Sequence, residues 1–62
     1  MHKLLVSPRG AYVSLVRHQE LGSIHVKLQY KGRVLKSYLS SGDMNTLVKV
    51  WKYYGYKVVA SV

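Results

Sequence analysis

Lysine, tyrosine, histidine and glutamine side chains are the groups in this sequence whose types and spacing suit the binding of an anionic ligand. His25, Lys27 and Gln29 occupy alternate positions of one short segment, and Lys36 and Tyr38 do so in the next. Ammonium groups contact phosphates, tyrosine and histidine rings stack on sugars or bases, and a glutamine amide hydrogen-bonds to base edges. This combination indicates nucleic-acid binding.

The charge balance favours the same class of partner. Ten lysines and arginines against two acids give the 62 residues a net charge of +8, which predicts an anionic partner. An apolar content of 48% excludes a disordered basic tail, and the lack of cysteine excludes a disulfide scaffold. Because the sequence shows neither a signal peptide nor an apolar run of about 18 residues, we expect a cytoplasmic protein with no membrane partner.

Catalytic and metal-binding groups are scarce. Glu20 and Asp43 are the only acids, so a paired-carboxylate mechanism is not expected. Gly-rich phosphate loops and a strand–Ser–helix elbow are absent. His18 and His25 can be diagonal neighbours, but two histidines without a third ligand do not make a metal site. We therefore expect a binding protein rather than an enzyme, with no cofactor and no metal.

Short apolar runs separated by turn residues predict the strands that must position these groups. Runs rich in Val, Leu, Ile and Tyr lie at about residues 2–6, 11–18, 24–30 and 33–39. A last alternating run, from Tyr56 to Val62, predicts a short C-terminal strand. Either edge of the sheet can accept this last strand.

After Ser41 the apolar period changes to that of a helix. The apolar stripe consists of Met44, Leu47, Val48, Trp51 and Tyr54. Ser41 or Asp43 can cap its first turn, and Gly55 followed by Tyr56 suits a left-handed C-terminal cap. We therefore predict one α+β domain over residues 1–62. It is an antiparallel meander of three to four strands packed on one face by a single helix, followed by the short C-terminal strand.

Loop lengths predict how the strands pair. A two-residue turn at Lys31-Gly32 pairs Leu28 with Leu35, Val26 with Ser37 and Ile24 with Leu39. A four-residue loop at 19–22 pairs Leu15 with Val26 and leaves Arg17 opposite Ile24. A four-residue loop at 7–10 places Leu4 beside Val13. In these registers the apolar side chains share one face, and Tyr30, Trp51 and Tyr54 are expected in the core.

The same registers place Lys27 directly opposite Lys36 on the uncovered face. Like charges in that arrangement destabilise a sheet unless an anion lies between them. The predicted nucleic-acid-binding residues lie on this face or at the tips of its loops: Arg9, Tyr12, His25, Lys27, Gln29, Lys31, Arg33, Lys36 and Tyr38. A second candidate surface is the outer side of the helix, with Asn45, Lys49, Lys52 and Tyr53.

At the level of pattern, Ile24 to Trp51 resembles the small DNA-binding domains built from a three-stranded sheet and a helix. These include the arm-binding domains of tyrosine integrases and the plant ethylene-response-factor type. The matching features are the strand Ile24–Tyr30, the Lys31-Gly32 turn, the basic strand Arg33–Leu39, Gly42 and a helix that carries Trp51. The resemblance covers less than half of the chain. It implies that Lys27, Gln29, Lys36 and Tyr38 contact the major groove.

Three functions follow from these observations. The leading hypothesis is a small nucleic-acid-binding protein that uses the exposed sheet face, with double-stranded DNA preferred over RNA. The alternative is a protein of the viral or plasmid type that binds and inhibits a host protein through that protein's acidic surface, using Val16, Val34 and an edge strand. The third is a small ribonuclease toxin with His25 between Lys27, Lys36 and Tyr38. A homodimer that extends the small core is a further possible assembly.

Overall fold

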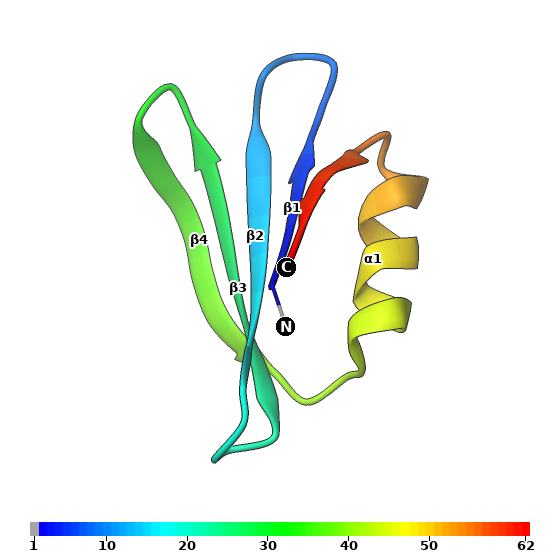
Figure 1. Ribbon diagram of the computed structural model, residues 1–62. Coiled ribbons are helices and arrows are strands. Elements are labelled where there is room, and N and C mark those ends of the chain that lie inside the picture. The colour runs from blue at the N-terminus through cyan, green and yellow to red at the C-terminus, as the bar shows by residue number, and fades with distance from the viewer. Residues whose placement is uncertain (1) are drawn as a thin grey trace.

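The computed structural model describes residues 2–62, which form one antiparallel sheet and one helix (Figure 1). The elements in chain order are β1 (His2–Val6), β2 (Tyr12–His18), β3 (Ser23–Tyr30), β4 (Arg33–Ser40), α1 (Met44–Tyr53) and β5 (Lys57–Ser61). The strand order across the sheet is β4-β3-β2-β1-β5. The predicted α+β class, the four-strand meander and the C-terminal strand are therefore confirmed.

The C-terminal strand joins the sheet beside β1. Strand β4 and strand β5 run in the same direction, because α1 returns the chain to the end at which β4 started. At the β4 edge, β5 would form a parallel pair, whereas at the β1 edge it forms an antiparallel one. Antiparallel pairing is the slightly more stable of the two per residue.

The core lies between α1 and the three strands β1, β2 and β3. Five strand residues and one helix residue are fully or almost fully buried there: Leu5, Val13, Leu15, Ile24, Val26 and Met44. Leu47, Val48 and Trp51 of the helix pack against this cluster, which confirms most of the predicted stripe. Within residues 2–62, α1 is too short and too polar to span a membrane.

Both ends of α1 are capped by the residues that the sequence indicates. At the start, the Asp43 carboxylate accepts a hydrogen bond of 2.6 Å from the Thr46 amide. At the end, Gly55 has a φ of 96°, and the amides of Gly55 and Tyr56 donate to the carbonyls of Lys52 and Trp51. This pair of bonds is a Schellman motif, with a contact between the Tyr56 and Trp51 rings.

Tyr54 was expected in the core, and this expectation is wrong. The helix ends at Tyr53, and Tyr54 is the capping residue, with 65% of its surface exposed. Tyr56, which follows the turn at Gly55, packs against the core. Tyr30 is half-buried at the end of β3.

The pairing of β2 with β3 is as predicted, and that of β1 with β2 is not. Leu15 lies opposite Val26, and Arg17 lies opposite Ile24. In β1, however, Leu5 rather than Leu4 pairs with Val13. The loop contains five residues, Ser7 to Ala11. It is closed by bonds from the Ser7 amide to the Ala11 carbonyl and from the Ala11 amide to the Ser7 hydroxyl.

The two-residue turn between β3 and β4 is correct, but a β-bulge follows it. Lys31 and Gly32 have φ values of 51° and 76°, and Gln29 pairs with Val34, as a turn of type I′ requires. The register then shifts between Leu28 and Gln29, and Leu35 becomes the extra residue. From there on, Lys36 pairs with Leu28. The predicted pairs Leu28–Leu35, Val26–Ser37, Ile24–Leu39 and Lys27–Lys36 are therefore wrong.

Candidate nucleic-acid interface

Four of the nine predicted binding residues meet on the sheet face opposite α1, which we call the outer face. Tyr12 pairs with Gln29, Ser14 with Lys27, and Val16 with His25. These side chains are half-buried by their neighbours on β2 and β3. Within residues 2–62, the helix covers only the other face of the sheet (Figure 1). A row of polar side chains therefore runs along β3 on the uncovered face, formed by His25, Lys27 and Gln29, and Tyr12 of β2 lies beside Gln29.

Lys36 and Tyr38 do not belong to this face. They pair with Leu28 and Val26, whose side chains point toward α1, because the bulge at Leu35 turns the rest of β4 over by one residue. Lys27 instead lies across from Ser37. Lys27 and Lys36 therefore do not repel each other across the strands, and no anion is needed between them.

The same shift separates the groups expected for a ribonuclease. His25 shares the outer face with Lys27, while Lys36 and Tyr38 lie on the face of α1. The partner of His25 is Ser37, whose hydroxyl lies 2.7 Å from Nε2 of the ring. His18 and His25 are diagonal neighbours as expected, with ring centroids 6.0 Å apart. In the part of the chain that the structure describes, no three His, Asp or Glu side chains are grouped to hold a metal ion.

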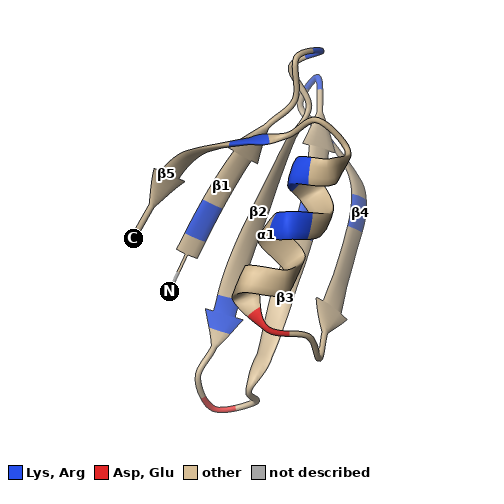
Figure 2. Cartoon of the chain, turned by 90° about the vertical axis from the view of Figure 1, so that its right-hand side faces the viewer, with Lys and Arg blue, Asp and Glu red and all other residues tan. Residues whose placement is uncertain are grey.

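The three predicted residues at loop tips lie at one end of the sheet. Arg9 is in the β1–β2 loop, and Lys31 and Arg33 are at the β3–β4 turn. In an up-and-down meander these two connections fall at the same end, and α1 also finishes there (Figure 2). Lys52 in the last turn of α1 and Lys57 at the start of β5 are thus at this end too. We call these five cations the basic end.

Both acids lie at the opposite end of the molecule (Figure 2). Glu20 is in the β2–β3 loop, and Asp43 precedes α1. Hydrogen bonds from Thr46 lower the pKa of Asp43, and the charges of Arg17 and Lys49 lower it further. The interactions of Asp43 are therefore with its own helix and with cations outside the basic end.

Two further surfaces are open. Asn45, Lys49, Lys52 and Tyr53 are all exposed on α1, as expected for the second candidate surface. Seven of the eight residues of β4 are also exposed, although this strand is rich in apolar side chains. The sequence suggested burial for Leu35 and Leu39, which are 55% and 57% exposed. The apolar alternation of β4 reveals neither the bulge, which turns Leu39 to the outer face beside His25, nor that α1 leaves this strand uncovered.

Comparisons with known proteins do not identify this chain. No family model, no curated protein and no solved structure matches it. The resemblance of Ile24–Trp51 to small DNA-binding domains therefore stays a prediction. Among the surfaces of the chain, the basic end gathers five cations at the end of the sheet opposite both acids.

Proposed function

We propose that this protein binds nucleic acid through the basic end and the adjoining part of the outer face. The observation that carries the proposal is the separation of charge, with five cations at one end of the sheet and both acids at the other. A phosphate chain that approaches the basic end gains counterion release and meets no carboxylate. The acids at the far end would orient the protein on its ligand.

The outer face adds groups that suit nucleotides beside these cations. Tyr12 begins β2 and Gln29 lies near the end of β3, so this cross-strand pair is close to the loops of the basic end. A tyrosine ring can stack on a base or a sugar, and a glutamine amide can hydrogen-bond to a base edge. Lys27 lies one pair further along the same face. The proposal implies a protein that works in the cytoplasm, where nucleic acid is accessible.

Fluorescence anisotropy with labelled DNA and RNA tests this proposal. The variant Lys31→Gln plus Arg33→Gln removes two charges from the basic end, and Lys3→Gln plus Arg17→Gln removes two charges elsewhere. Each double variant lowers the net charge from +8 to +6, so both lose the same number of charges and differ in the place of the loss. We expect the first to bind about tenfold more weakly, with a log–log salt slope reduced by about 2. The second should bind nearly as the parent does.

Two results would contradict the proposal. Binding of the parent protein that is unchanged between low and moderate salt would exclude phosphate contacts as the source of affinity. Equal losses in the two double variants would show that net charge alone matters and that the basic end has no special role. Circular dichroism of each variant checks that the sheet and helix are intact.

The exposure of β4 favours a second candidate function, the binding of a protein with an acidic surface. This strand forms one edge of the sheet. Val34 and Leu39 are about half exposed on it, and the strand also carries the cations Arg33 and Lys36. An extended segment of a partner can add to such an edge. A stoichiometric partner that survives nuclease treatment and is lost in Val34→Lys plus Leu39→Lys would favour this function over the first.

A further inference from the structure

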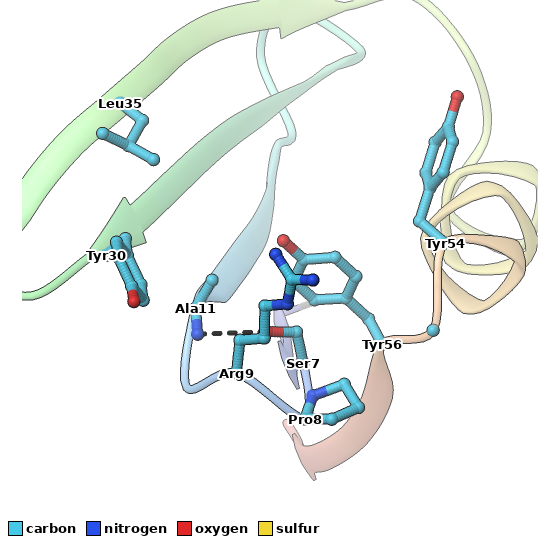
Figure 3. Close-up of a pocket in the computed structure, with 9 residues that line it drawn as sticks. Ser7, Pro8, Arg9, Ala11, Tyr30, Leu35, Tyr54 and Tyr56 are labelled. Atoms are coloured by element: carbon cyan, nitrogen blue, oxygen red, sulfur yellow. Dashed lines mark hydrogen bonds between the residues drawn. The ribbon is translucent and has the colours of Figure 1, made fainter.

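A cleft opens at the basic end, between the last turn of α1 and the β3–β4 hairpin. It has a volume of about 600 Å³. Its walls include Tyr30 and Leu35 of the hairpin, Tyr54 and Tyr56 after the helix, and Arg9 of the β1–β2 loop (Figure 3). Figure 3 shows Tyr54 across the opening from Tyr30 and Leu35. We call this feature the tyrosine cleft.

Trp51 supports two of the three aromatic side chains that line the tyrosine cleft. Its ring makes edge-on contacts with Tyr54, at a centroid distance of 6.0 Å, and with Tyr56, at 5.1 Å. Trp51 itself packs against the buried core. Tyr54 is thus supported on one side while 65% of its surface stays open to solvent. An exposed but supported aromatic ring is a ready surface for stacking, because little conformational freedom is lost when a ligand binds.

The polar groups of the cleft suit an anion. Arg9 contributes a guanidinium to its lining. Lys31 does not line the cleft, but its ammonium lies 5.3 Å from the centre of the Tyr30 ring, which does. Both acids are at the other end of the sheet. A ligand that matches these walls has a flat aromatic part and a negative charge. A cavity of this size accepts one such group of the dimensions of a nucleotide.

We propose that the tyrosine cleft binds one unpaired nucleotide of a single strand, with the base stacked on Tyr54 and a phosphate at Arg9. This inference rests on the proposed function and refines it. A base in a duplex is paired and stacked, so it cannot enter the cleft without the cost of unpairing. The basic end binds phosphates of either form, and the cleft makes the protein selective for single strands.

Anisotropy with an oligothymidine strand of about 12 nucleotides, alone and paired with its complement, tests the cleft. Tyr54→Ala removes the stacking surface, and Tyr54→Phe retains it. Tyr38→Ala is the matched control, since Tyr38 is a tyrosine of β4 that is 44% exposed and does not line the cleft. Tyr53 is unsuitable, because its ring lies 5.8 Å from that of Tyr54 and helps to hold it. We expect the parent to prefer the single strand. Tyr54→Ala should weaken single-strand binding about tenfold, with duplex binding and the salt slope unchanged.

The outcomes separate this inference from the proposed function. If neither form of DNA nor the RNA of the earlier test binds to the parent protein, the proposed function fails and the cleft proposal fails with it. If both forms bind with a steep salt dependence but Tyr54→Ala has no more effect than Tyr38→Ala, the proposed function stands. The cleft proposal is then overturned, and a peptide becomes the occupant to test. Full affinity in Tyr54→Phe together with the loss in Tyr54→Ala supports stacking.

Discussion

Strands β2 and β4 have similar apolar content and opposite surroundings. Val13 and Leu15 of β2 are completely buried, whereas Val34, Leu35 and Leu39 of β4 are between 49% and 57% exposed. The difference has two causes: the bulge turns Leu39 to the outer face, where Val34 also lies, and α1 is too small to cover Leu35. The ten residues of α1 form a helix about 15 Å long, and its buried and packed side chains contact residues of β1, β2 and β3. The strand beyond them stays open on both faces.

This contrast separates the stability of the protein from its candidate binding surfaces. The part of the sheet that α1 covers, strands β1 to β3, supplies the core. The free energy of folding depends mainly on the burial of this core. The β3–β4 hairpin extends beyond the helix and contributes Lys31 and Arg33 to the basic end and Tyr30 and Leu35 to the tyrosine cleft. Changes in the two parts should therefore have very different effects on stability.

The largest expected difference is between two leucine truncations. Leu15→Ala empties a site with no solvent exposure and should lower the free energy of unfolding by about 3 kcal/mol. Leu39→Ala removes a side chain that already faces water for the most part, and should cost less than about 1 kcal/mol. Urea unfolding followed by circular dichroism measures both values. Equal costs would show that β4 is covered in solution, for example by a second copy of the chain.

The turn of the hairpin offers a smaller effect of opposite sign. Lys31 adopts a φ of 51°, which is unfavourable for a lysine and well tolerated by asparagine. Lys31→Asn should raise the free energy of unfolding by about 0.5–1 kcal/mol. It should also weaken nucleic-acid binding, because one cation of the basic end is lost. Thermal unfolding and anisotropy on the same sample test the two halves of this prediction, and a loss of stability would contradict it.

The smallest expected effect is on the pH dependence of stability and concerns Asp43, which caps the start of α1. The pKa of Asp43 is lowered, chiefly by the hydrogen bonds from Thr46, so folding favours its ionised form. Its contribution is complete above the ordinary pKa of an aspartate, about 4, and is lost as the pH falls through the lowered value. Asp43→Asn should show a flatter decline in stability as the pH falls below about 4. Parallel declines in both proteins would argue against this cap.

Much of the fold could be predicted from local patterns. The alternation in residues 24–30 identifies β3, and the change of period after Ser41 identifies α1. Asp43 and Gly55 mark the helix ends, since their side-chain and backbone requirements are local. The β2–β3 register also followed from a loop length. Each of these features depends on residues that are close together in the sequence.

The candidate site could be predicted only in part. Tyr12, His25, Lys27 and Gln29 do share a face, because the β2–β3 register is regular. Lys36 and Tyr38 were assigned to that face on the assumption of an unbroken β4, and one extra residue at Leu35 moved them to the other. The tyrosine cleft was missed because Tyr54 fits the helical stripe. Only the end of the helix at Tyr53 places it at the surface.

The sequence by itself determined the elements, their periods, the caps and the excess of positive charge, since these follow from the types and spacing of neighbouring residues. Tertiary structure alone decided that β5 pairs with β1, that β4 carries a bulge and stays uncovered, and that five cations gather at the end of the sheet opposite both acids. Such features depend on how far the helix reaches across the sheet and on which loops fall together. Both are set by the packing of residues that are distant in the chain.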